Sequence, residues 1–227
     1  MPLQNRVDPF GAIHAVAQRG MFTGNRGVIH DPATKALLER RWTTKAWIIC
    51  SCDYKGVRRE PMGRNGPKGA TGWTELFFLD EVTALAAGHR PCFLCRRERA
   101  KEFAGCFSKG NKLPSIAAPE IDRILHGERR ASSGVVHKLT AEEAWSLPDG
   151  AMVEQAGLPL AVLGEWLIPW FHEGYGRIVG RTAVEEADTF LLTPAGTVAA
   201  IRAGYRPIWS ATLRDFEANA ELIGPDI

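Results

Sequence analysis

Hydrophobic residues follow two different patterns along the chain. Before residue 110, the apolar runs at 47–54 and 73–79 are typical of strands, and the spacing at 80–87 and 96–107 is helical. From Leu147 onward the pattern predicts short strands at 151–153, 160–163, 165–170, 176–179 and 189–192. Thr193 and the proline after it then begin a last helix, which Gly204 ends. Together these elements predict an α+β fold whose second part is a small curled sheet or partial barrel with a C-terminal helix against it.

Local signals mark where two of the early helices begin and end. Asp31 and the proline after it predict a helix over 31–41, because Asp caps a helix and Pro suits its first turn. Asp80 is a second candidate N-cap, and Gly88 is well placed to end the helix that follows it.

The stretch 105–119 is rich in Gly, Pro and Lys and predicts a linker. We therefore expect two units, 1–110 and 118–227. After the linker, Pro119 predicts the start of a helix, and Thr140 opens a capping box for a short one.

The charge balance is uneven along the chain. In all there are 28 Lys and Arg against 26 Asp and Glu, yet residues 40–101 hold 13 basic and 6 acidic residues and the remainder holds 15 and 20. Glycines and basic side chains also dominate 55–72, which predicts an exposed basic loop. A basic region suits a polyanion such as nucleic acid, although a solvated surface rich in Arg would have the same composition. The candidate phosphate contacts are Arg58, Arg59, Arg64, Arg96 and Arg97.

The chain has 5 Cys, including a C-x-x-C pair at Cys92 and Cys95. An odd number of cysteines, a C-x-x-C motif and an N-terminus without an apolar signal region predict a reducing compartment, metal binding and a cytoplasmic location. No stretch approaches the ~20 apolar residues of a membrane span, so we expect no membrane association.

Half of a zinc site is predicted by Cys92 and Cys95, since zinc in structural sites takes four N or S ligands, usually as two close pairs. Cys50 and Cys52 are the obvious second pair. Two residues apart, they share a face of a regular strand, so they can both bind the metal only if the strand bends. His89 and His30 are alternatives for the fourth ligand. A metal-free interior with small buried cysteines is a further alternative.

The run Leu85-Ala-Ala-Gly-His-Arg-Pro-Cys-Phe-Leu-Cys-Arg96 resembles the second half of the Ada-like N-terminal zinc-binding domain of the DNA methylphosphotriester repair protein family. That family combines a cysteine-bearing strand, an alanine-rich helix ending in glycine, and arginine-proline-cysteine-x-x-cysteine. The resemblance covers residues 47–97. It departs at Cys50-Ser-Cys52, where the family has cysteines separated by three residues, and in the longer basic loop.

The resemblance implies a Zn²⁺-binding module that contacts the DNA backbone. It also implies a role for Cys50, which matches the family's zinc-bound nucleophilic cysteine that takes a methyl group from a phosphotriester. The leading hypothesis is a zinc protein that binds nucleic acid, expected to be DNA.

Two other functions are kept open by the sequence. One is an enzyme acting on DNA, by alkyl transfer to Cys50 or by hydrolysis in the second half, where His126 lies near Asp122 and Glu128. The other is a module with a purely structural zinc that binds a small molecule or a protein. An aromatic run around Trp170 could line a pocket for such a ligand, or belong to the core.

Overall fold

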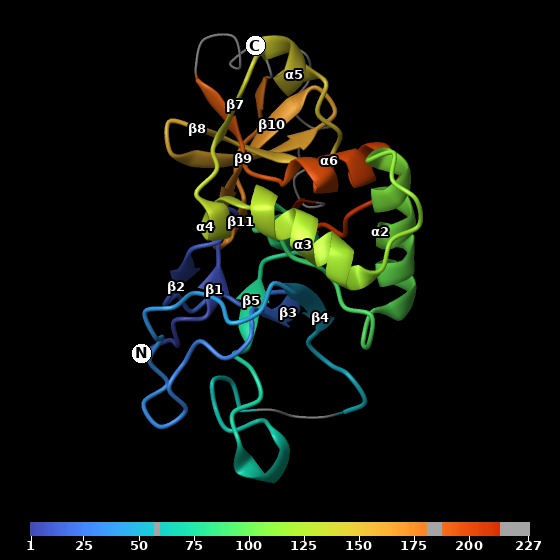
Figure 1. The fold of residues 1–227 in the computed structure, drawn as a ribbon. Helices are drawn as coiled ribbons and strands as arrows, with labels where there is room; N and C mark the ends of the chain where they lie inside the picture. Colours follow the sequence, from blue (N-terminus) through green and yellow to red (C-terminus); the bar gives the residue numbers. More distant parts are fainter. Residues whose placement is uncertain (57–59, 181–187, 214–227) are drawn as a thin grey trace.

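The computed structural model describes residues 1–56, 60–180 and 188–213 and has the expected α+β class, with two sheets at opposite ends and helices between and beside them (Figure 1). The strands are β1 (Arg6–Val7), β2 (Ile13–His14), β3 (Phe22–Asn25), β4 (Ile48–Ser51), β5 (Leu76–Phe78), β6 (Arg90–Pro91), β7 (His137–Leu139), β8 (Met152–Gln155), β9 (Leu158–Leu163), β10 (Trp166–Phe171), β11 (Gly174–Tyr175), β12 (Val179–Gly180) and β13 (Thr189–Leu191). The helices are α1 (Glu81–Ala86), α2 (Arg97–Gly110), α3 (Ala118–Glu128), α4 (Arg130–Ser133), α5 (Ala141–Trp145) and α6 (Ala195–Arg202), with a 3-10 turn η1 (Pro67–Gly69). Within the described ranges, no helix has the length and apolar character needed to cross a membrane.

The first sheet has six strands in the order β2-β1-β5-β3-β4-β6. Two of its pairings, β1 with β5 and β4 with β6, are parallel and join segments far apart in the sequence. All six strands are only two to four residues long. The order places β4 directly beside β6, so the cysteines at the ends of these two strands come together.

The second sheet is the β-rich part that the sequence predicted. Its order is β11-β10-β9-β8-β13-β7, with β12 pairing β10, and every described pairing in it is antiparallel. Successive residues of β8, β9 and β10 pack alternately into two apolar clusters, one on each face of the sheet, and helix α6 follows it as expected.

Helix α1 is buried on every side between the two sheets. Ala84 and Leu85 pack into the core of the first sheet, and Val82 and Ala86 pack into that of the second. As predicted, Asp80 caps the helix, accepting a hydrogen bond from Thr83 N at 2.8 Å.

Gly88 follows α1 with a positive φ of 81°, and a Cβ there would lie 2.7 Å from the side chain of Arg129. Glycine therefore ends this helix both by its conformation and by its lack of a side chain.

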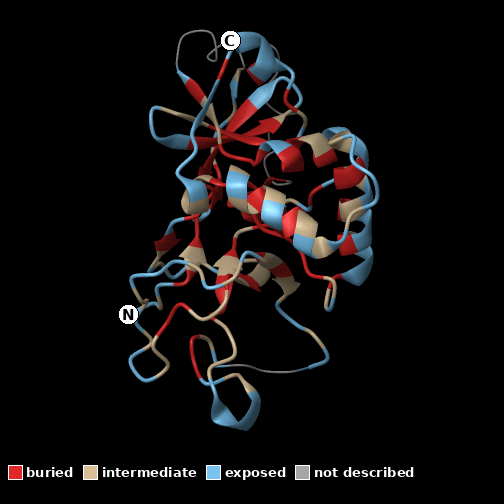
Figure 2. Ribbon diagram, in the orientation of Figure 1, coloured by how far each residue is buried: buried red, intermediate tan, exposed pale blue. Residues whose placement is uncertain are grey.

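The helices α2, α3 and α6 share one buried cluster with the first sheet, which includes Phe103 and Phe107 from α2, Leu125 from α3 and Ile201 from α6. In Figure 2 the buried residues concentrate where these helices meet the sheets. The division into 1–110 and 118–227 stays a prediction, although this cluster joins residues on both sides of it.

The helix predicted over 31–41 does not form. Asp31 Oδ1 instead accepts hydrogen bonds from Ala33 N at 2.7 Å and Thr34 N at 3.1 Å, and Lys35 has a positive φ of 57°. This local turn uses the same acceptor that a helix cap would use. By contrast, the predicted capping box at Thr140 is present.

Candidate metal centre and adjacent pocket

The register of β3, β4 and β5 places one set of side chains in the apolar core and the alternate set on the opposite face of the sheet. Thr23 pairs with both Cys50 and Phe77, so these three side chains lie on the same face. Their neighbours Ile49 and Leu76 point the other way and are fully buried in the core. Cys50 therefore lies on the face turned away from the core.

Cys92 and Cys95 lie in a tight turn between β6 and α2. Cys92 N donates to Ile49 O at 2.9 Å, which fixes the turn beside β4, and Arg96 N donates to Cys92 O at 3.0 Å. Leu94 N also points at Cys92 Sγ at 3.4 Å, as a backbone N–H does toward a thiolate. The turn thus holds both thiols next to Cys50.

The Sγ atoms of Cys50, Cys92 and Cys95 all lie within 4.8 Å of one another. A tetrahedral zinc with sulfur ligands at about 2.3 Å holds them about 3.8 Å apart, so small side-chain shifts would complete such a site. Three cysteines are therefore positioned to hold a metal ion.

The three thiols strongly affect each other's ionisation. Hydrogen bonds from Cys50 and Cys95, and then from the backbone amides, lower the pKa of Cys92 far below its ordinary value. The pKa of Cys50 rises because it donates to Cys92 and is buried. A bound cation would stabilise the thiolate forms of these side chains.

The fourth predicted cysteine lies outside this group. Cys52 is exposed, and its thiol donates to Met21 O at 3.4 Å. Strand β4 ends at Ser51, so Cys52 no longer follows the alternation that Cys50 obeys. It still lines the pocket described below.

Both candidate histidines are held away from the thiols. His30 Nδ1 lies 2.6 Å from Thr74 Oγ1, and His89 Nε2 accepts from Arg26 Nε at 3.2 Å. His89 is fully buried on the core side of the sheet, with its ring 4.6 Å from that of Phe78. Among the described residues, neither histidine belongs to the metal-ligand group.

The five predicted phosphate contacts fall into three groups. Arg58 and Arg59 lie outside the described residues. Arg64 and Arg97 are exposed. Arg96 is buried, pairs with Glu81 at 2.8 Å, and so has its charge balanced inside the protein, where it has no surface to offer a phosphate.

The acidic residues near His126 also have structural partners. Asp122 forms a two-pronged pair with Arg90, at 2.9 and 2.7 Å. Glu128 Oε2 accepts from Gly196 N, near the start of α6, at 2.9 Å. These contacts account for both carboxylates as links between elements.

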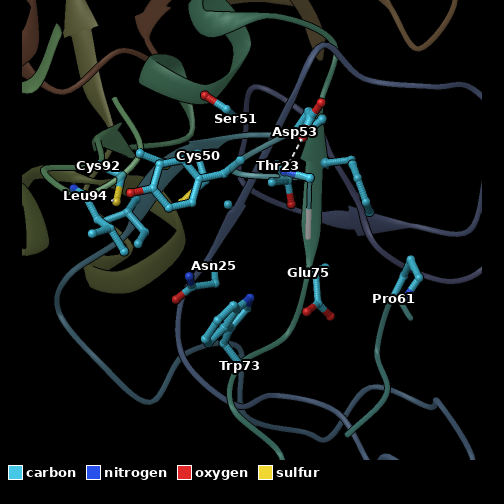
Figure 3. Close-up of a pocket in the computed structure, with 17 residues that line it drawn as sticks. Thr23, Asn25, Cys50, Ser51, Asp53, Pro61, Trp73, Glu75, Cys92 and Leu94 are labelled. Carbon is cyan, nitrogen blue, oxygen red and sulfur yellow. Dashed lines mark hydrogen bonds between the residues drawn. The ribbon is translucent and has the colours of Figure 1, made fainter. Parts of the chain in front are cut away.

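A pocket of about 770 Å³ opens beside the three thiols (Figure 3). Its floor is the outer face of β3, β4 and β5, and one wall is the turn that carries Cys92 and Leu94. The segment before β5 closes the opposite side, where Trp73, Glu75 and Pro61 lie in Figure 3. The lining residues are Thr23, Gly24, Asn25, Ile48, Cys50, Ser51, Cys52, Asp53, Tyr54, Gly56, Pro61, Trp73, Glu75, Phe77, Cys92, Leu94 and Cys95.

Sequence reasoning missed the lining of this pocket. The signal was present in the predicted strand at 73–79, where Glu75 and Phe77 alternate with the buried Leu76 and Phe78. Alternation alone does not show whether the face that carries Glu75 and Phe77 is covered by other elements or borders a pocket.

Comparisons with protein-family models, curated proteins and solved structures found no match to the chain.

Proposed function

We propose that the protein binds one Zn²⁺ through Cys50, Cys92 and Cys95, and that this centre belongs to a nucleic-acid-binding surface. The observation that carries the proposal is the convergence of three thiols at the edge of a pocket in the most basic part of the chain. Sulfur ligands favour zinc over the hard cations Mg²⁺ and Ca²⁺. The resemblance to the Ada-like zinc domain supports the same metal and the same three residues.

Three protein ligands are typical of zinc sites that leave the fourth position to water or a substrate. Here the cluster borders a pocket that is large enough for a small ligand. Zinc in this site would stabilise the turn and polarise whatever group approaches it from the pocket. Cys52 is the alternative fourth ligand, because it lines the same pocket two residues beyond Cys50.

Metal content tests the site directly. Elemental mass spectrometry should find about one zinc per chain in the wild type, as expected for a single zinc site with three or four cysteine ligands. We expect the metal to be lost in Cys92→Ser and kept in Cys106→Ser, whose cysteine lies outside the cluster. Cys52→Ser then reports whether the fourth ligand is this thiol. A wild-type protein without metal after anaerobic purification would refute the proposal.

Nucleic-acid binding is supported by exposed basic side chains on the segments around the pocket. Lys55, Arg64 and Lys68 are exposed on the segment between β4 and β5, and Arg97 is exposed at the start of α2. Contacts to phosphates release counterions, so the affinity should fall steeply with salt.

Fluorescence anisotropy with labelled DNA from about 50 to 200 mM salt measures this dependence. The double variant Arg64→Ala/Arg97→Ala should reduce the slope of log K against log salt by about one per lost contact. Lys138→Ala, which removes one positive charge from the second sheet, is the control and should leave the slope unchanged. A flat salt dependence would exclude a phosphate-binding surface.

A second candidate function is alkyl transfer to Cys50, favoured by the position of this residue both in the thiol cluster and on the pocket floor. The thiolate sulfur would attack the methyl carbon of a methylphosphotriester. The bond from that carbon to oxygen breaks, and the phosphodiester leaves with the electron pair. Since the triester is uncharged, the acidic side chains of the pocket do not repel it.

Incubation with methylphosphotriester DNA followed by intact-mass measurement tests this step. Gain of one methyl group by the wild type and by Cys52→Ser, but not by Cys50→Ser, would support it. An unchanged mass in zinc-loaded wild type would refute alkyl transfer and leave the binding proposal standing.

A further inference from the structure

The pocket beside the thiols has aromatic walls from three separate segments. Tyr54 follows β4, Trp73 precedes β5, and Phe77 lies within β5 on the outer face of the sheet. All three are half-buried; Lys55 Nζ lies 5.5 Å from the centre of the Tyr54 ring, and Arg6 Cζ lies 4.7 Å from that of Phe77. The volume of about 770 Å³ lies within the range of about 300–1,000 Å³ usual for sites that bind small organic molecules.

Polar groups in the same pocket are fixed by their own neighbours. Glu75 Oε2 accepts from Met62 N at 2.9 Å, and Oε1 accepts from Asn65 Nδ2 at 2.5 Å. Asn25 Oδ1 accepts from Gly27 N at 3.2 Å. The amide nitrogen of Asn25 offers two donors, so this side chain can still meet the edge of a flat ring.

The described lining of the pocket carries acidic side chains. Among the described residues that line it, none is Lys, Arg or His, whereas Asp53 and Glu75 are acidic. Basic residues lie outside the lining: Lys55, Arg64 and Lys68 are exposed on the segment that follows Tyr54. A ligand with a flat uncharged ring and a separate phosphate matches both regions.

The geometry points to the pocket as a binding site for a nucleobase, stacked on Trp73 and Tyr54, with Asn25 and Glu75 at its edge. This inference rests on the proposed nucleic-acid-binding function and deepens it, because it assigns the base to the pocket and the phosphates to the basic surface outside. The base can come from a free nucleoside or from an unpaired position in a strand, and the test below separates the two.

The test compares three probes on the zinc-loaded full chain: a single-stranded oligonucleotide, a fully abasic oligonucleotide of equal length, and free nucleosides. We expect the normal strand to bind about tenfold or more tightly than the abasic strand, as for aromatic stacking of bases. Trp73→Ala should abolish this difference, and Trp73→Phe should largely keep it. Trp166→Ala, which removes an exposed indole from the second sheet, should leave it unchanged.

Zinc content and circular dichroism identify any variant that fails to fold, and Tyr54→Ala serves as the second pocket variant in that case. Equal binding of normal and abasic strands, or a difference that both Trp73→Ala and Tyr54→Ala leave unchanged, would overturn the inference while leaving salt-dependent binding intact. Nucleoside binding that depends on Trp73, without oligonucleotide binding, would support the base site and refute the nucleic-acid part of the proposed function.

Discussion

The two sheets of this protein are stabilised by different means. The second sheet consists of antiparallel strands up to six residues long, with two apolar clusters on its faces. The first sheet has strands of two to four residues, two parallel pairings and long connections between them. Because its own strands are short, the first sheet shares its apolar core with helices α2, α3 and α6, and the three thiols join β4 to the turn after β6 on its other face. The candidate chemistry thus lies in the less regular half of the molecule.

Removal of the metal should have the largest effect on the difference in stability between the two sheets. If zinc joins Cys50 on β4 to the turn after β6, then chelation or Cys92→Ser should destabilise the first sheet by about 5 kcal/mol or more, compared with about 10–16 kcal/mol in zinc-finger peptides. Hydrogen exchange should accelerate in β3, β4 and β6 and remain slow in β9 and β10. Uniform loss of protection in both sheets would show that they do not differ in this way.

The buried junction around α1 should produce the next largest effect. Asp80 accepts hydrogen bonds from Tyr175 Oη at 2.7 Å and Ser210 N at 3.0 Å, besides its cap to Thr83 N. Asp80→Ala leaves these buried donors without an acceptor and should cost about 3–5 kcal/mol. Tyr175→Phe removes one hydrogen bond and should cost about 1 kcal/mol. Urea unfolding followed by two probes, one in each sheet, measures both. A near-zero cost for Asp80→Ala would refute a coupling role for this carboxylate.

Acid sensitivity should originate in the first half. Burial, and then the charges of Arg26 and Arg129, hold the pKa of His89 well below its ordinary 6.5. The folded protein therefore keeps His89 neutral, while the unfolded chain takes up a proton below pH 6.5. The contribution of His89 to the free energy of unfolding is fully present above pH 6.5. It decreases as the pH drops below 6.5, by up to about 1.4 kcal/mol per pH unit.

Replacement of this histidine isolates its contribution. His89→Gln keeps an acceptor for Arg26 and cannot titrate. Between pH 6.5 and 5, the unfolding free energy of the variant should therefore depend less on pH than that of the wild type, by about 1.4 kcal/mol per pH unit. Parallel pH profiles for the two proteins would contradict the prediction.

The smallest effect is expected for an exposed ion pair of the second sheet. Lys138 Nζ lies 2.7 Å from Asp188 Oδ1, but both side chains are more than half exposed. Lys138→Ala should change the free energy of unfolding by less than about 0.5 kcal/mol, because water screens such pairs. A cost above 1 kcal/mol in urea unfolding would show that this half also depends on surface charge.

Local signals predicted those parts of the fold that depend on near neighbours. Asp80, Gly88 and Thr140 act on residues within one helical turn, and each behaves as predicted. The strands β9 and β10 were also predicted, as short apolar runs at 160–163 and 165–170, but their pairing was not. The helix predicted from Asp31 was wrong because the same hydrogen bonds occur at a helix cap and in an isolated turn.

The candidate site was predictable only in part, for a related reason. Cys92 and Cys95 form a local motif, and Cys50 was the matching cysteine upstream. The position of Cys52 depended on where β4 ends, and that follows from its pairing with β3 and β6. The pocket needed the register of three strands together, which no local pattern contains.

The parallel pairing of β1 with β5 affects how the chain folds as it is synthesised. The local pairs β1–β2 and β3–β4 can form early, but the strand that joins them is β5, in which Phe77 pairs with Arg6. At about 5–20 residues per second, the ribosome needs roughly 4–14 s to reach Phe77 after Arg6. Cys50 is therefore synthesised well before Cys92 and Cys95, and the group of three thiols can assemble only after Cys95 has been added.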